Sequence, residues 1–264
     1  MQNRTEATHL MKDIPPQSKR SEIGTRISGQ GNVAASAQLS LATITLLEIL
    51  STIISVILIN WAIVPIYPQS HWPLIAPTFL IISFIIYSQI KRGESWKDLG
   101  FSRNHFGTAL RFLLLPVTLG CTILFTIGYF TNSIHRSTHL GTNLLIIPFW
   151  GIVQQYVLQG FLYRRIRSLF SLLPYCSAAH SQRVWLAILL TAGLFAAVHL
   201  PNLTLASLTL LAAIVWTWVY ERAPNLWALG LSHGLLSLVL MHSLPLRFLH
   251  SMSIGYKHFL YQKF

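Results

Sequence analysis

Three apolar segments in the second half of the chain carry the side chains best suited to chemistry, and each contains a pair of residues four positions apart. The pairs are Gln155 and Gln159, Phe195 and His199, and His233 and Ser237. Residues four apart lie on one face of a helix, so each segment presents one ridge. Gln154 lies about 100° around the helix from Gln155. Because polar side chains within a membrane usually face the interior of a bundle, we expect the ridges to meet in a buried site.

A purely structural role for these side chains is the first alternative. Gln, Ser and His also join membrane helices through hydrogen bonds worth about 0.6–2 kcal/mol each. For any one residue alone this interpretation is favoured. Two histidines and a Gln triplet on neighbouring segments favour a site instead.

A zinc site is the second alternative. His199 and His233 supply two ligands, whereas a catalytic zinc normally has three protein ligands. No Cys, Asp or Glu stands nearby at a matching spacing, and the helical His-Glu-x-x-His motif is absent. We therefore expect no metal and no other cofactor.

The elements that position these ridges are membrane-spanning helices. Of the 264 residues 53% are hydrophobic and 10% are charged, whereas a soluble domain has about 25% charged residues. A helix needs roughly 20 apolar residues to cross the bilayer. The runs long enough are 46–67, 72–90, 112–130, 144–163, 184–200, 203–220 and 226–244. They do not alternate in polarity as barrel strands do, so we predict an all-α bundle of about seven transmembrane helices.

The links between the runs predict how the bundle is arranged. Only Pro201 and Asn202 separate the fifth and sixth runs, which indicates a tight helical hairpin. Residues 1–38 hold five Lys or Arg and residues 91–111 another five, and 164–183 holds four. With seven spans these segments share one side, which the positive-inside rule makes cytoplasmic. We expect an integral membrane protein of the bacterial cytoplasmic membrane with its N-terminus in the cytoplasm.

The basic residues also account for the net charge of +12. They border the predicted spans, where they face the headgroups of the bilayer. The lipid bilayer is thus the expected partner, and nucleic-acid binding is not expected.

We divide the chain into four parts on this basis. Residues 1–38 form a disordered basic lead, 39–141 the first three spans with a cytoplasmic linker, 142–244 a core of four spans, and 245–264 a C-terminal tail. No short apolar stretch with a cleavage site precedes the first span, so we expect no cleaved signal peptide.

The three ridges resemble the motifs of the CAAX-protease and bacteriocin-processing family of intramembrane glutamic endopeptidases, also called the Abi or self-immunity family. Its pattern is Glu-Glu-x-x-x-Arg, then Phe-x-x-x-His, then His-x-x-x-Asn, on successive helices. Here the elements read Gln154-Gln155-Tyr-Val-Leu-Gln159, an intact Phe195 to His199, and His233-Gly-Leu-Leu-Ser237. Three further segments are similar to the family, namely Gly160-Phe161-Leu162, Asn225-Leu226-Trp227 and Leu99-Gly100-Phe101.

This resemblance implies roles for the matching positions. In the family the first Glu and the His of the second motif activate water, the last His and Asn stabilise the oxyanion, and the Arg holds the glutamates. His199 then takes the role of the first histidine and His233 the oxyanion role, with Ser237 in place of Asn. Gln154 stands at the position of the general base, yet an amide accepts no proton at neutral pH. Gln159 in place of Arg is coherent, because a buried cation without carboxylates is costly.

Three interpretations remain open. The first is a divergent intramembrane endopeptidase that processes a membrane-associated peptide or protein, with His199 as sole base and Gln154 and Gln155 orienting water or substrate. The second is an inactive pseudo-peptidase that binds a membrane segment or partner. The third is a small-solute transporter, although the chain has no inverted repeat.

Overall fold

The protein is helical throughout the residues that the structure describes. This computed structural model describes residues 17–66, 72–135, 140–173 and 179–261, in which there is no strand. Contacts divide the chain into two compact units, residues 1–44 and 45–264. All the ridges identified above belong to the second unit. The prediction of an all-α polytopic bundle is confirmed.

The helices follow one another closely along the chain. They are α1 (Gln17–Leu58), the π-helix η1 (Ile59–Ile63), α2 (Val64–Ile66), α3 (Trp72–Lys91), α4 (Phe106–Phe130), α5 (Leu140–Gln155), the π-helix η2 (Tyr156–Tyr163), α6 (Arg164–Leu172), α7 (His180–Val198), α8 (Leu203–Arg222), α9 (Leu226–Ser243), α10 (Leu246–Leu249), the 3-10 helix η3 (His250–Met252) and α11 (Tyr256–Tyr261).

Each predicted span corresponds to a helix. Six continuous helical stretches are long and apolar enough to cross a membrane, and the seventh, in α3, has a shorter apolar part, Ile75–Lys91. The protein is therefore an integral membrane protein. The largest differences from the predicted boundaries are that the first apolar stretch begins at Ser36, that α4 begins at Phe106, and that the fourth span continues through η2 and α6 to Leu172. Of the predicted disordered lead, residues 1–16 lie outside the described residues, and α1 begins at Gln17.

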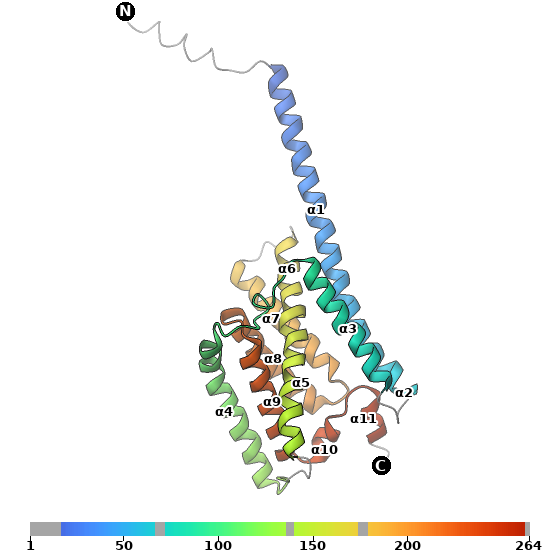
Figure 1. Ribbon diagram of the computed structural model, residues 1–264, viewed down its shortest axis with the longest axis vertical. Coiled ribbons are helices and arrows are strands. Elements are labelled where there is room, and N and C mark those ends of the chain that lie inside the picture. The colour runs from blue at the N-terminus through green and yellow to red at the C-terminus, as the bar shows by residue number, and fades with distance from the viewer. Residues whose placement is uncertain (1–16, 67–71, 136–139, 174–178, 262–264) are drawn as a thin grey trace, which may run out of the picture. The chain divides into compact units, whose positions relative to one another are not determined.

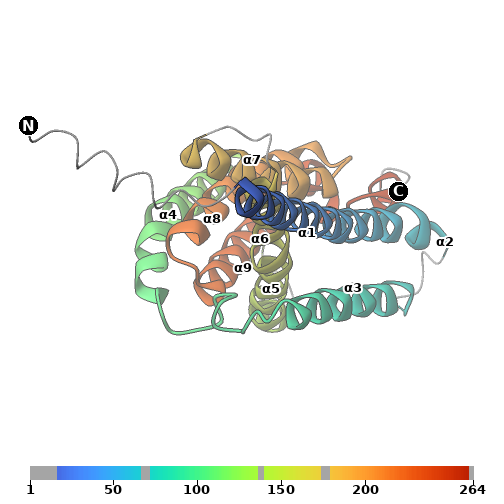
Figure 2. The ribbon, with the colours of Figure 1, turned by 90° about the horizontal axis from the view of Figure 1, so that it is seen from above.

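The helices that carry the ridges lie side by side in the second unit (Figure 1). Helix α9 packs against both α5 and α4, while α8 packs against α7 and α4. In the view along the bundle, α8 and α9 lie between α4 on one side and α7 and α5 on the other (Figure 2). Residues from all three ridges thereby come within reach of one another.

Glycines allow α5 and α9 to approach until their backbones touch. A Cβ on Gly151 of α5 would lie 2.6 Å from the carbonyl oxygen of Gly230, and a Cβ on Gly230 would lie 2.6 Å from the Cα of Ile152. Gly234, one turn along α9, faces the backbone of Pro148 in the same way. Gly230 and Gly234 form the small-xxx-small pattern by which membrane helices pack closely.

We predict that Gly234→Ala destabilises the protein, because its Cβ would lie 2.9 Å from the backbone nitrogen of Pro148. Forcing the helices apart in this way costs about 1–3 kcal/mol. Gly193→Ala on α7 is the matched control, since nothing lies within 4 Å of the added Cβ and alanine favours the helix. Thermal unfolding in detergent should show a lower midpoint for Gly234→Ala only. Equal midpoints for the two variants would contradict the close packing.

The predicted hairpin between the fifth and sixth spans is confirmed. Asn202 in the turn is buried and caps α8, since its Oδ1 accepts a hydrogen bond from the backbone N–H of Leu205 at 3.1 Å. Its Nδ2 donates to the carbonyl oxygen of Leu249 at 2.7 Å. The turn after His199 is thus attached to the C-terminal segment.

Two of the basic segments predicted to share one side, 91–111 and 164–183, contact each other in the second unit. Arg165, with a side chain only 2% exposed, pairs with Glu48 of α1 and Glu94 of the linker after α3, both at 3.0 Å. Arg92 pairs with the same Glu48 at 2.6 Å. Ion pairs therefore join α1, α3 and α6 where the spans end.

The Glu94 carboxylate should make this end of the protein sensitive to pH. Partial burial acts to raise the pKa of Glu94, but hydrogen bonds and charges from Arg165 and Arg164 outweigh it, so the pKa lies below its ordinary value of 4.5. A lowered folded-state pKa stabilises the protein above the unfolded pKa, and this contribution is lost as the pH falls through the folded pKa.

We predict that Glu94→Gln lowers the thermal midpoint at pH 7, because charged hydrogen bonds worth about 1.5–3 kcal/mol are lost. The difference from the wild type should shrink as the pH falls from the ordinary value of 4.5 through the lowered folded-state pKa, because the wild-type carboxyl is then progressively protonated. Midpoints measured in one detergent from pH 7 to about pH 3.5 test this. A difference that stays constant over that range is the contrary result.

Candidate functional site

A cavity of about 690 Å³ lies among α4, α5, α8 and α9 and reaches the end of α7. Four of the six predicted site residues line it, namely Gln154, His199, His233 and Ser237. Most of the other lining residues are apolar. The expectation that the two histidines face one cavity, on which the interpretation as a peptidase depends, is thus met in the structure.

His199 lies at the end of α7. Its Nδ1 is 2.7 Å from the carbonyl oxygen of Phe195, one turn earlier. A carbonyl oxygen can only accept, so Nδ1 carries the hydrogen and donates it. In the neutral imidazole Nε2 then keeps its lone pair and is a proton acceptor.

His233 has the opposite arrangement. Its Nδ1 lies 3.2 Å from the amide nitrogen of Gln155. With the amide donating, Nδ1 is the acceptor and the neutral ring carries its hydrogen on Nε2. The amide oxygen of Gln155 has no partner among the described residues. If the amide were turned round, its NH2 group would take the position of the oxygen, and two N–H donors would lack acceptors there. Two unpaired donors cost more free energy than one unpaired carbonyl oxygen.

Aromatic rings fix the planes of both imidazoles. Trp216 of α8 stacks on His233 with centroids 4.4 Å apart and planes 22° apart. The ring of Phe195 packs edge-on against His199 at 4.7 Å and against His233 at 6.2 Å. The site therefore holds a proton acceptor on His199 and a hydrogen-bond donor on His233. The phenyl ring of Phe195 packs against both imidazoles.

The amides of Gln155 and Gln159 contact different helices. Gln155 points to His233 of α9, whereas the Gln159 amide donates to the hydroxyl of Thr217 on α8 at 2.9 Å. Both side chains are buried, and neither residue lines the cavity. The prediction of a common face assumed α-helical geometry. The π-helix η2 between the two residues has a wider turn, which separates their directions.

Two residues of the site were not anticipated from the sequence. Trp216 and Thr217 lie in an apolar run in which aromatic and hydroxyl residues are common, so no spacing marks them. The pattern Gly230-x-x-x-Gly234 was visible and brackets His233. A small-xxx-small motif is the signal that identifies α9 as a helix packed closely on a neighbour.

Two segments outside the ridges contact each other. Gly100, with a φ of +95° that favours glycine, accepts a hydrogen bond at its carbonyl from the N–H of Leu226 at 3.0 Å. The rings of Phe101 and Trp227 pack edge to face at 5.5 Å. Asn225 caps α9 by accepting from the N–H of Ala228 at 2.9 Å. The linker before α4 thus holds the start of α9, the helix that carries His233.

The described residues contain no group of three or more His, Cys, Asp or Glu that could hold a metal ion. The cavity has two histidines and no carboxylate in its lining. The expectation of no metal and no other cofactor stays a prediction.

The fold and the site define a membrane helix bundle with a paired-histidine cavity between its spans. Residues 136–239 match the family model described as type II CAAX prenyl endopeptidase Rce1-like. No curated protein and no solved structure matches the chain. The matched segment contains all six predicted site residues, and over this segment the chain is similar to the CAAX-protease family.

We predict that Thr217→Val destabilises the protein by about 1–3 kcal/mol, because it removes the partner of the buried Gln159 amide. The amide oxygen of Gln159 already has no partner among the described residues. Thr209→Val on the same helix is the control, since its hydroxyl only donates to the carbonyl of Ala206 within α8, at 3.0 Å. Thermal midpoints should fall for Thr217→Val and change little for Thr209→Val. A larger fall of the midpoint for Thr209→Val than for Thr217→Val would mean that the Gln159 amide does not depend on the Thr217 hydroxyl.

Proposed function

We propose that the protein is an intramembrane endopeptidase in which His199 is the general base and His233 binds the carbonyl oxygen of the scissile peptide. The observation that carries the proposal is that two imidazoles at one cavity have opposite partners at Nδ1, a carbonyl oxygen at His199 and an amide nitrogen at His233. Phe195 O fixes a lone pair on Nε2 of His199, and Gln155 fixes a hydrogen on Nε2 of His233. Hydrolysis of a peptide bond needs both, a base for water and a donor for the developing oxyanion.

The steps follow from these two groups. Nε2 of His199 takes a proton from a water molecule as its oxygen attacks the peptide carbonyl carbon. The Nε2–H of His233 donates to the carbonyl oxygen, on which negative charge develops. The protonated His199 then gives its proton to the nitrogen of the leaving amine, and the C–N bond breaks. Gln154 and Ser237, which also line the cavity, are placed to hydrogen-bond the peptide.

The cavity suits a substrate that comes from the bilayer. Several of its lining residues are also on the outer surface of the spans, with Leu119 56%, Trp150 48% and Leu211 64% exposed. The cavity therefore extends to the lipid-facing surface. An apolar or membrane-associated peptide can enter there without crossing water.

A site without glutamate carboxylates is expected to hydrolyse peptides more slowly. General-base catalysis typically contributes about 10²–10⁴-fold, and in this site one imidazole supplies it without a neighbouring glutamate. Turnover slower than that of a glutamate-containing relative is expected. The buried amides Gln155 and Gln159 then serve to hold the site together.

We predict that His199→Asn lowers cleavage of a membrane-associated peptide at least about 10²-fold. His105→Asn is the control, because His105 is exposed in the linker before α4 and asparagine tolerates its φ of +60°. Purified protein in nanodiscs with a library of apolar peptides, read by mass spectrometry, gives the rates. Cleavage that survives in His199→Asn would rule out its role as base.

A pseudo-peptidase that binds a membrane segment without cutting it is the second candidate. No carboxylate is found among the described residues that line the cavity, which favours this candidate. The triple variant Gln154→Glu, Gln155→Glu, Gln159→Arg separates the two candidates. Cleavage that appears only in the triple variant supports the binding protein, whereas cleavage by the wild type that depends on His199 supports the peptidase.

A further inference from the structure

A second pocket, of about 480 Å³, lies at the end of the bundle where two of the basic links meet, and it shares no lining residue with the histidine cavity. We propose that it binds the headgroup of an aminophospholipid, a zwitterionic phosphodiester with a primary ammonium group. Arg164, Arg167 and Ser168 receive the phosphate, while Asp98 and Glu221 receive the ammonium. The proposal does not depend on the peptidase activity.

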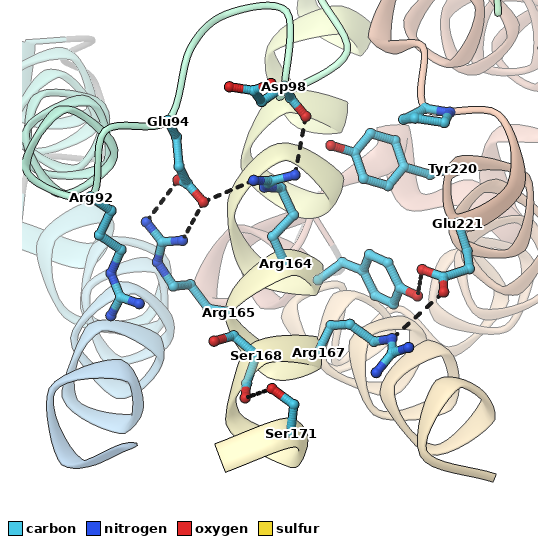
Figure 3. Close-up of a pocket in the computed structure, with 12 residues that line it drawn as sticks. Arg92, Glu94, Asp98, Arg164, Arg165, Arg167, Ser168, Ser171, Tyr220 and Glu221 are labelled. Atoms are coloured by element: carbon cyan, nitrogen blue, oxygen red, sulfur yellow. Dashed lines mark hydrogen bonds and ion pairs between the residues drawn. The ribbon is translucent and has the colours of Figure 1, made fainter. Parts of the chain in front are cut away.

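One face of α6 provides donors to this pocket. Arg164, Arg167, Ser168 and Ser171 all line it and are spaced i, i+3, i+4 and i+7, which places them along one side of the helix (Figure 3). Arg164 and its neighbour Arg165 both donate to Glu94 (Figure 3). Guanidinium groups with a nearby hydroxyl are a common arrangement for binding phosphate oxygens.

The acidic residues of the pocket keep free acceptor atoms. Both hydrogen bonds to Asp98, from the N–H and the hydroxyl of Ser95, end on Oδ2, at 2.9 and 2.6 Å. They hold the pKa of Asp98 below its ordinary value, so it is charged at neutral pH. Glu221 accepts the hydroxyl of Tyr163 on Oε2 at 2.6 Å, and its Oε1 lies 3.6 Å from Arg167. Oδ1 of Asp98 and Oε1 of Glu221 can therefore accept from an ammonium group.

The arginines of the row keep donors beyond their present contacts. Arg164 donates from Nη1 to the carbonyl oxygen of Asp98 and from Nη2 to Glu94, both at 3.0 Å. Arg167 pairs through Nε with Glu221 at 3.6 Å. Each Nη group carries two hydrogens, so both guanidinium groups, whose side chains are 30% and 21% exposed, keep hydrogens that can be donated to a phosphate.

The balance of charge selects a zwitterion over an anion. Arg92, Arg164, Arg165 and Arg167 are matched by four carboxylates, three in the pocket lining and Glu48 behind it. A ligand with net negative charge would find no excess of positive charge here. A headgroup with one phosphate charge and one ammonium charge leaves the cluster neutral and uses both sets of free atoms.

The position of the pocket favours a lipid over a soluble compound. Its residues come from the linker after α3, from the end of η2, from α6 and from the end of α8, and the candidate spans Leu140–Leu172 and Leu203–Arg222 end here. Charged residues at the ends of spans lie at the level of the headgroups. A lipid there is present at high local concentration, with its acyl chains along the bundle.

Native mass spectrometry of the full chain, released from detergent with added lipids, tests the proposal. Dioleoylphosphatidylethanolamine should be retained about tenfold better than dioleoylphosphatidylglycerol, dioleoylphosphatidylcholine or diolein, since one charged hydrogen bond accounts for about tenfold. Equal retention of these four lipids would overturn it. Displacement of the lipid by soluble phosphoethanolamine at equal concentration would also overturn it, because the ligand would then be a soluble phosphodiester or monoester.

Variants separate binding from folding. Asp98→Asn should remove the preference for phosphatidylethanolamine over phosphatidylcholine, and Arg167→Gln should lower retention of both about tenfold. Arg111→Gln, an exposed arginine outside the pocket, should change neither. An unchanged preference in folded Asp98→Asn contradicts the proposal. Should Asp98→Asn or Arg167→Gln fail to fold, the selectivity of the wild type decides it.

Discussion

The contact between the backbones of α5 and α9 is the constraint on which the rest of the site depends. Gly151, Gly230 and Gly234 permit it, since any side chain at these positions would meet main-chain atoms. Only at this separation does the short amide of Gln155 reach the imidazole of His233, 3.2 Å away. The close packing of α5 against α9 therefore determines the tautomer of His233, in which Nε2 carries the hydrogen.

Charged side chains lie where burying them costs the least free energy. Among the described residues, the cavity lining includes one amide, two imidazoles and two hydroxyls, which can be buried in neutral form with one or two hydrogen bonds. In contrast, the carboxylates and guanidinium groups that form ion pairs among the described residues lie together at one end of the bundle. The uncharged side chains of Gln154, Gln155 and Gln159, at positions that resemble the Glu and Arg positions of the CAAX-protease motif, agree with this division.

Much of the architecture could be predicted because it depends on local properties of the chain. Run lengths predicted the helices, the two-residue link predicted the hairpin, and the spacing of His199 and His233 predicted a shared cavity. The directions of Gln155 and Gln159 could not be predicted, because a π-helix has no marked residue pattern. The partners of Arg165 could not be predicted either, since Glu48 and Glu94 are far away in sequence and pairing at that range depends on the packed fold.

The most direct test of the central claim is the protonation of the two histidines. Nitrogen-15 NMR of protein labelled at histidine, in nanodiscs at pH 7 and with His199→Asn and His233→Asn for assignment, distinguishes the two neutral tautomers. The structure predicts a hydrogen on Nδ1 for His199 and on Nε2 for His233. The same tautomer at both positions, or two imidazolium ions, would contradict the account, because the cavity would then lack either its acceptor or its donor.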